Sequence, residues 1–323
     1  MSFVRWGVLS TAKIGRTLVI PAMQDAQRCE VVAIASRDAA VARSVANDLS
    51  IERAYGSYDA LLADADIDAV YIPLPNHMHA QWTIAAARQG KHVLCEKPIA
   101  LSVAEATTMV TAGAETGVIL REAFMYRYQP TWQAVLRLIG EGDIGEITGV
   151  DSFFSYFNDD PSNIRNVLKY GGGALMDIGC YPIHLSRLLM GGEPTQITAS
   201  TRRDPTTGVD TYVAAILEFG DRIATFACST RVEPDQRVDI YGTAGRVSIE
   251  IPFNPPEDQP TRFTLTRDGG SKSQIFEFEA SNHYTLQAEA MAAAILDGDS
   301  LQDSGEDVLG NIAVIERVFA AAG

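Results

Sequence analysis

The first 120 residues alternate between short apolar runs and longer helical patterns, and this alternation constrains the fold more than any other feature. Apolar, β-branched runs alternating with amphipathic stretches predict parallel strands in one sheet with helices on both faces. Ligands of such folds bind at the carboxyl ends of the strands. The expected strands cover residues 4–9, 31–35, 69–72, 92–95 and 118–123, and the expected helices cover 14–26, 39–49, 79–89 and 103–115.

The pattern changes near residue 124, where strand-like segments separated by glycine-containing turns become dominant. This favours a second domain with an open, largely antiparallel sheet. The sequence therefore predicts an α/β protein: a doubly wound parallel sheet in residues 1–123 and an α/β domain in residues 124–323. The expected strands of the second domain cover 147–156, 196–201, 212–219, 222–228, 237–242, 245–251, 262–266 and 274–278, with helices over 131–141, 176–190, 284–296 and 304–322.

The charge balance excludes several classes of partner. Lys and Arg number 26 against 41 Asp and Glu, which gives a net charge of -15. A field of this sign repels nucleic acid and anionic membrane surfaces. No apolar run approaches the roughly 18 residues of a membrane span, and the N-terminus lacks the features of a signal peptide. The four cysteines form no CxxC pair, which predicts reduced thiols in a cytoplasmic protein.

The first strand is followed by a turn that resembles a degraded dinucleotide fingerprint. Ser10, Ala12 and Gly15 occupy the positions of the three fingerprint glycines. Small residues there still allow backbone N–H groups to approach a pyrophosphate at the start of a helix. By itself the pattern is weak, and an ordinary tight strand-to-helix turn explains it equally well.

The second strand ends at residues that favour NADP over NAD. An acidic residue at the strand tip usually binds the ribose diol of NAD, but Ser36 and Arg37 stand there instead. Arg37 is suited to pairing with a 2′-phosphate, and Ser36 to hydrogen-bonding it. Asp38, one residue later, keeps NAD open as the alternative.

Two further strand ends carry polar residues. Pro73–His79 follows the third strand, and Glu96 and Lys97 follow the fourth. Placing two charged side chains at the end of a buried parallel strand costs free energy, which suggests that Glu96 and Lys97 have a functional role. The alternative is a Glu–Lys ion pair with a structural role. His77 and His79 have no further ligand at useful spacing, so no metal site is expected.

Three glycines, Gly171 to Gly173, lead into a helix that carries Asp177, Tyr181 and His184. Asp177 and Tyr181 are four residues apart and are expected to share a helix face. Without further context, a helical tyrosine is more often a core residue, and His184 is expected to be a packing residue.

In combination, these segments resemble the Gfo/Idh/MocA family of NAD(P)-dependent oxidoreductases. The resemblance rests on the turn Gly7–Gly15, the loop Pro73–His79, Glu96-Lys97-Pro98 and the segment Gly171–Tyr181, and it covers essentially the whole chain. Within the family the chain looks most like the branch with glucose–fructose oxidoreductase, sugar 1-dehydrogenases such as xylose dehydrogenase, and dimeric dihydrodiol dehydrogenase. The resemblance implies an N-terminal Rossmann domain and a C-terminal sheet that mediates oligomerisation as a dimer or tetramer.

The resemblance also implies roles for individual residues. Lys97 and Tyr181 would form the proton-transfer pair, with Asp177 orienting the substrate or the tyrosine. Asn76 and Glu96 would position the nicotinamide and Lys97. The residues expected to bind the cofactor are therefore Ser10, Thr11, Ala12, Lys13, Ile14, Ser36, Arg37, Pro73, Asn76, His79, Glu96 and Lys97.

The expected substrate is a sugar, a polyol or a cyclic diol. Met125, Phe154 and Tyr156 are candidates for the pocket wall and Arg165 for binding hydroxyl groups, beside Lys97, Asp177 and Tyr181. Packing within the sheet explains Tyr156 equally well. Aromatic walls with a few polar groups suit such ligands. Two alternatives stay open: a member that retains its cofactor and performs internal redox for hydrolysis or epimerisation, and a dinucleotide-binding sensor without catalysis.

Overall fold

The computed structural model describes residues 2–299 and 305–323, which fall into two compact units. The first unit comprises Met1–Met125 and Asn282–Leu309, and the second comprises Tyr126–Ser281 and Gly310–Gly323. This division differs from a single cut near residue 124, because α8 (His283–Asp297) returns to the first unit. Its buried residues Ala288, Met291 and Ala292 join the core beneath the first strands. Burying this apolar face stabilises a helix that sequence order alone assigns to the second domain.

The first unit is built on a six-stranded sheet in the order β3-β2-β1-β4-β5-β6, and all of its strand pairs are parallel. This confirms the predicted parallel sheet. The order reverses between β1 and β4, and in folds of this kind ligands bind at the carboxyl ends of the strands beside such a reversal. The strands are β1 (Val4–Leu9), β2 (Cys29–Ala35), β3 (Arg53–Tyr55), β4 (Ala69–Ile72), β5 (His92–Cys95) and β6 (Leu120–Glu122).

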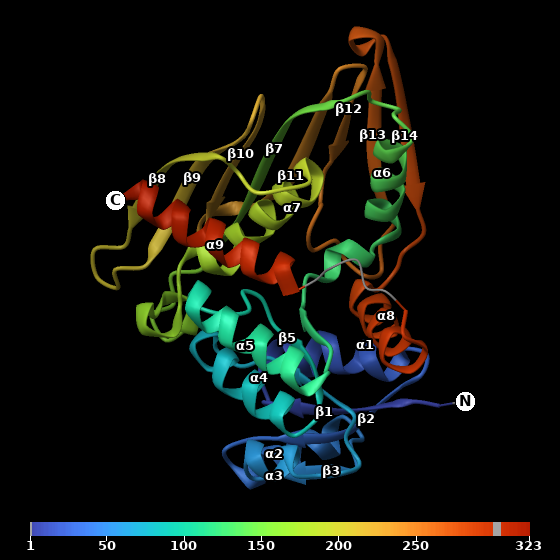
Figure 1. The fold of residues 1–323 in the computed structure, drawn as a ribbon, viewed down its shortest axis with the longest axis vertical. Coiled ribbons are helices and arrows are strands. Elements are labelled where there is room, and N and C mark those ends of the chain that lie inside the picture. The colour runs from blue at the N-terminus through green and yellow to red at the C-terminus, as the bar shows by residue number, and fades with distance from the viewer. Residues whose placement is uncertain (1, 300–304) are drawn as a thin grey trace. The chain divides into compact units, whose positions relative to one another are not determined.

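Helices connect these strands (Figure 1). Several begin at a capping side chain that accepts backbone N–H groups: Asp38, Ser57, Ser102 and Asn282. The expected helix over 14–26 contains a π-helical turn near its start, η1 (Gly15–Val19). The remaining helices are α1 (Ile20–Asp25), α2 (Ala39–Asp48), α3 (Tyr58–Leu62), the 3₁₀ turn η2 (Asn76–Met78), α4 (His79–Arg88) and α5 (Val103–Thr116).

The second unit contains an eight-stranded sheet in the order β14-β13-β12-β11-β7-β10-β9-β8. Among these strands β7 and β10 run parallel, whereas the other neighbours are antiparallel, which confirms the predicted largely antiparallel sheet. The strands are β7 (Ile147–Phe157), β8 (Gln196–Arg203), β9 (Asp210–Phe219), β10 (Arg222–Ser229), β11 (Arg231–Gly242), β12 (Gly245–Ile249), β13 (Thr261–Arg267) and β14 (Lys272–Phe278).

Helices α6 (Pro130–Gly140) and α7 (Cys180–Met190) and the part of α9 from Gly310 onward lie on one side of this sheet (Figure 1). Helix α9 spans Gly305–Ala322, and Ser304, where the sequence predicted its start, lies outside the described residues. A π-helical turn, η6 (Leu175–Gly179), precedes α7. Each helix in residues 2–299 and 305–323 is too short or too polar to span a bilayer.

The glycine run before η6 is explained by two close approaches. A Cβ atom at Gly173 would lie 2.0 Å from Oδ1 of Asp210, and Gly173 has a φ of +125° that disfavours other residues. A Cβ at Gly172 would lie 2.4 Å from the carbonyl oxygen of Arg165. Asp210 is buried, and its Oδ2 accepts a hydrogen bond of 2.7 Å from the backbone N–H of Leu175. The glycines therefore let a carboxylate on β9 hold the start of the segment that carries Asp177 and Tyr181.

We predict that Gly173→Ala destabilises the protein by about 2 kcal/mol, because alanine disfavours a positive φ and its Cβ displaces Asp210. The matched control is Gly192→Ala, since a Cβ at Gly192 meets no atom within 4 Å. The midpoint of urea-induced unfolding, followed by circular dichroism, measures both variants. Equal midpoints for the two variants would contradict this account of the glycine run.

Candidate functional site

The turn after β1 has a glycine-like backbone at the position of the first fingerprint glycine. Ser10 has a φ of +149°, in the region of positive φ that favours glycine. Its Oγ accepts a hydrogen bond of 3.0 Å from the N–H of Ala12. A Cβ at Gly15 would lie 3.5 Å from Pro73 Cγ and 3.7 Å from Tyr71 Cε1, so η1 packs closely against the end of β4. The first helical turn offers backbone N–H groups to an anion, so this segment fits a pyrophosphate.

The tip of β2 presents Arg37 to solvent, beside Tyr58. Burial raises the pKa of the Tyr58 phenol and the neighbouring Arg37 guanidinium opposes the rise. Asp38 has a structural task here, because its Oδ1 accepts hydrogen bonds from the N–H groups of Ala40 (2.8 Å) and Val41 (3.2 Å) at the start of α2. Of the two charged residues at this tip, Asp38 caps α2, whereas Arg37 is exposed and has no capping role.

The loop after β5 is held by hydrogen bonds from several sides. Glu96 donates its N–H to the carbonyl of Ile72 (3.2 Å), and its Oε1 accepts from the buried Tyr71 hydroxyl (2.6 Å). The Lys97–Pro98 peptide bond is cis. These contacts fix the backbone on either side of Lys97, which is half-buried.

The loop after β4 contains Pro73 and Asn76, and it ends at His79, the first residue of α4. His79 is completely buried. Its Nδ1 lies 2.9 Å from the carbonyl oxygen of Pro98, and its Nε2 lies 2.7 Å from that of Leu74. Both ring nitrogens of this expected cofactor residue therefore face backbone carbonyls. Among the residues of the described ranges, no group of three or more His, Cys, Asp or Glu side chains is arranged to hold a metal ion.

In the second unit, two of the expected site residues, Tyr156 and Arg165, donate hydrogen bonds to a third, Asp177. Asp177 is buried, and its Oδ1 accepts a hydrogen bond of 2.9 Å from Nε of Arg165. Its Oδ2 accepts a short hydrogen bond from the hydroxyl of Tyr156. Burial and the neighbouring Asp177 carboxylate raise the pKa of Tyr156 well above its usual range. The sequence predicted Arg165 as a substrate contact and Tyr156 as either a substrate contact or a packing residue of the sheet, whereas here both donate to Asp177.

Tyr181 lies in a cluster of aromatic rings. Its ring centroid is 5.6 Å from that of Phe154, 6.1 Å from that of Tyr126 and 5.3 Å from that of Phe253. His184, one turn further along α7, places Nδ1 2.6 Å from the Tyr126 hydroxyl. The expected wall residue Phe154 is thus adjacent to Tyr181, while Met125 is buried at the end of the first unit.

Sequence reasoning missed Phe253, which lies in a proline-rich loop between β12 and β13. The loop is anchored by a hydrogen bond of 2.6 Å from Trp132 Nε1 to the carbonyl of Pro252. Oε1 of Gln236 accepts from the N–H groups of Phe253 (3.2 Å) and Asn254 (3.1 Å). Periodicity carries no signal for such a residue, because tertiary hydrogen bonds rather than a helix or strand orient its ring.

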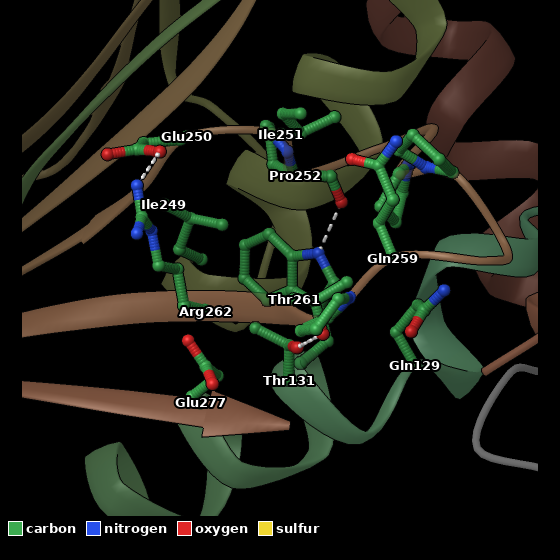
Figure 2. A pocket seen from close by; sticks show the side chains of 14 residues that line it. Gln129, Thr131, Ile249, Glu250, Ile251, Pro252, Gln259, Thr261, Arg262 and Glu277 are labelled. Atoms are coloured by element: carbon green, nitrogen blue, oxygen red, sulfur yellow. Dashed lines mark hydrogen bonds and ion pairs between the residues drawn. The ribbon is translucent and has the colours of Figure 1, made fainter. Parts of the chain in front are cut away.

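A cavity of about 350 Å³ lies in the second unit behind this loop (Figure 2). Its polar wall residues largely bind one another: Thr131 with Thr261, and Glu250 with Arg262 at 2.9 Å. Its apolar walls come from prolines, isoleucines and Trp132. None of the expected catalytic residues lines it. The lining residues are Gln129, Thr131, Trp132, Ile249, Glu250, Ile251, Pro252, Pro255, Pro256, Gln259, Pro260, Thr261, Arg262 and Glu277.

Comparison with known proteins agrees with this geometry. The profile of an oxidoreductase family with an NAD-binding Rossmann fold matches residues 4–124, and that of the GFO/IDH/MocA C-terminal domain matches residues 132–248. An oxidoreductase of Rhizobium meliloti is 42% identical over 100% of this chain and 98% of its own. A D-xylose 1-dehydrogenase (NADP(+)) of Haloferax volcanii is 37% identical over 98% of this chain and 97% of its own.

Among solved structures, a 3-ketoreductase from Actinomadura kijaniata in complex with NADP and TDP-benzene is similar to this chain, with a TM-score of 0.91 and 30% identity over 99% of this chain and 98% of its own. The same enzyme has been solved with a tyrosine replaced by phenylalanine and with a lysine replaced by alanine or glutamate. Matches over both halves and full-length relatives confirm the resemblance seen in the sequence: the chain is an oxidoreductase that belongs to the GFO/IDH/MocA family.

Proposed function

We propose that this protein is an NADP-preferring oxidoreductase that transfers a hydride between nicotinamide C4 and a carbon of a sugar, polyol or cyclic diol. One observation carries the proposal. The lysine and the tyrosine replaced in the variants of the ketoreductase are separated by the same number of residues as Lys97 and Tyr181. Lys97 also follows the end of a parallel strand, β5, and Tyr181 follows the glycine run, as the resemblance implies.

The preference for NADP is supported at the tip of β2. Arg37 is a cation exposed at the place where a 2′-phosphate would lie, and Ser36 adds a hydroxyl donor. Asp38 is occupied with the N-terminus of α2, which weakens the case for a ribose diol contact. The ketoreductase binds NADP, and the xylose dehydrogenase is named for it. NAD is the second cofactor to be tested.

The turn from Ser10 to Ile14 would hold the pyrophosphate, and Pro73, Asn76 and Glu96 would hold the nicotinamide half. When bound, the nicotinamide supplies the carbon that accepts or gives up the hydride. The chain itself supplies proton transfer. A tyrosine hydroxyl with an ordinary pKa of about 10 is a poor base at neutral pH. In the mechanism that the family resemblance implies, the ammonium of Lys97 would stabilise the Tyr181 phenolate, so that Tyr181 would take the substrate hydroxyl proton in oxidation and return it in reduction.

Asp177 would orient the substrate. Two donors, Tyr156 and Arg165, stabilise its ionised form, and a carboxylate only accepts hydrogen bonds. A hydroxyl group of a sugar or polyol is the matching donor. The rings of Phe154 and Phe253 beside Tyr181 add apolar surface of the kind that packs on the carbon face of such a ligand.

We predict that Lys97→Met and Tyr181→Phe each lower kcat by about 10²–10⁴, the usual contribution of general acid–base catalysis. Absorbance at 340 nm, with NADP and NAD in parallel and a panel of aldoses, polyols and cyclic diols, measures the rates. Lys272→Met is the control, because Lys272 lies on β14, the edge strand of the second sheet, away from α7. Near-normal turnover of Lys97→Met would refute the assigned role. Substrate conversion without net NADPH change would favour internal redox.

We predict that Arg37→Ala raises the KM for NADP by about 30-fold, since a charge-assisted hydrogen bond contributes about 2 kcal/mol, and leaves the KM for NAD within about threefold. Arg43→Ala, which removes an exposed arginine within α2, serves as the control. Steady-state kinetics with both cofactors decide the matter. An equal change in both KM values would exclude contact between Arg37 and the 2′-phosphate.

The protein would act as a homo-oligomer built through the second sheet, with a second copy of this chain covering its outer face. Side chains pointing away from the helices include Ile216 and Ile223, exposed by 42% and 47%. Ile223, Gly149 and Tyr241 form one lateral row across β10, β7 and β11, where a glycine keeps the centre flat. A broad sheet face with exposed apolar side chains such as Ile216 and Ile223 is suited to a twofold interface. The four cysteines are all free and buried, which supports a cytoplasmic location.

We predict that Ile223→Glu converts the oligomer to monomers, because it buries a charge at the centre of the twofold interface. Light scattering after gel filtration measures the mass. Ile251→Glu is the matched control, since Ile251 is exposed by 46% but follows β12 in the proline-rich loop. A wild-type monomer, or an unchanged oligomer in Ile223→Glu, would contradict the assignment of this face.

A further inference from the structure

We propose that His79 is a positioning residue for hydride transfer: its imidazole ties the loop after β4 to the loop after β5 through the carbonyls of Leu74 and Pro98. The proposal rests on the proposed function, because these loops carry Asn76 and Lys97. It assigns to His79 an action through backbone rather than a contact with the cofactor.

The position of His79 supports this action. The ring is completely buried, and Nδ1 and Nε2 lie 2.9 and 2.7 Å from the carbonyl oxygens of Pro98 and Leu74. A side chain without exposed surface and with both polar atoms directed at backbone has no group left to bind a ligand directly. Leu74 precedes Asn76 by two residues and Pro98 follows Lys97 by one, so the imidazole links the supports of both candidate residues.

The main chain alone joins these loops only at their bases. The ladder between β4 and β5 ends at the pair Ile72 and Cys95, and Glu96 N–H then donates to the Ile72 carbonyl. His79 adds a link further along both loops. The N–H side of the peptide unit between Pro98 and Ile99 is held by Glu122, whose Oε1 accepts a hydrogen bond of 2.9 Å from the Ile99 N–H. This peptide is therefore bonded at its carbonyl and at its N–H, which fixes its orientation.

The chemistry of imidazole makes this link difficult to replace. A carbonyl oxygen only accepts, so each bond needs an N–H, and a neutral ring has one N–H where the imidazolium has two. Burial lowers the pKa of His79 to about 4, with Lys97 and His77 contributing in the same direction. Near neutral pH the ring therefore has one N–H and donates to one of the two carbonyls. Donation to the Pro98 carbonyl is the bond that joins the two loops, because Leu74 and His79 belong to the same loop and helix start. Glutamine can also donate to one carbonyl, whereas leucine fills the space without donating.

The experiment uses the full-length chain and three variants: His79→Leu, His79→Gln and, as matched control, His283→Gln. His283 is also buried in the first unit, with a pKa lowered to about 4 by burial, but it lies in α8. We expect kcat/KM for the dinucleotide to fall about 100-fold in His79→Leu and about 10-fold in His79→Gln, since displacements of about 1 Å cost up to 10² in rate. The control stays within threefold at a similar loss of urea midpoint. His79 variants with kcat and KM within twofold of wild type, at any stability, would overturn the proposal.

Two readouts do not depend on the variants or on turnover. In the wild-type protein, the ring N–H of His79 should be visible by ¹⁵N–¹H NMR and protected from solvent exchange, unlike that of the exposed neighbour His77. Exchange as fast as that of His77 would overturn the link. Dinucleotide affinity measured by fluorescence should weaken about 10-fold in His79→Leu, and unchanged affinity would count against it. If no substrate is turned over by the wild type, the proposed function fails while these two readouts still test His79.

Discussion

The reversal of strand order between β1 and β4 is the constraint on which the rest of the first unit depends. Helical connections run to opposite faces of the sheet on either side of this point, so the loops at the carboxyl ends separate and leave room for a ligand. The turn after β1 and the loops after β4 and β5 all lie at this edge of the sheet. Side chains hold these segments in place: Ser10 and His79 hydrogen-bond to main chain nearby, and Glu96 accepts from the Tyr71 hydroxyl, so the edge is organised before any ligand arrives.

In the second unit, two buried carboxylates hold the segment that carries the candidate residues. Asp210 holds the N-terminal end of η6, and Asp177, within η6, is held by Tyr156 and Arg165. An isolated buried carboxylate would be costly, but each of these is paired with donors that offset its desolvation. Each unit has a π-helical turn beside its own candidate residues, η1 in the first and η6 in the second, and such turns are frequent at functional sites. In η6 the turn also changes the geometry between Asp177 and Tyr181, for which the sequence assumed regular α-helical spacing.

Long periodic elements could be predicted well from sequence. β1, β4 and β5 begin and end where the apolar runs do, because these central strands are buried on both faces. β3 and α3 were missed: Arg53–Tyr55 is half-buried and carries little apolar pattern. The candidate residues were found where strand ends or glycine runs mark them. Phe253 was not, because its importance comes from contact with Tyr181, which is distant in sequence.

The sequence by itself determined the parallel order of strands and helices, the family and the positions of Lys97, Asp177 and Tyr181, because periodicity, turns and motifs are local properties of the chain. Only the tertiary structure decided that α8 completes the core of the first unit, that Arg165 and Tyr156 donate to Asp177, and that His79 joins two loops. The physical reason is that a hydrogen bond or a packed face needs a partner at a specific distance, and that partner is supplied by folding rather than by sequence neighbours.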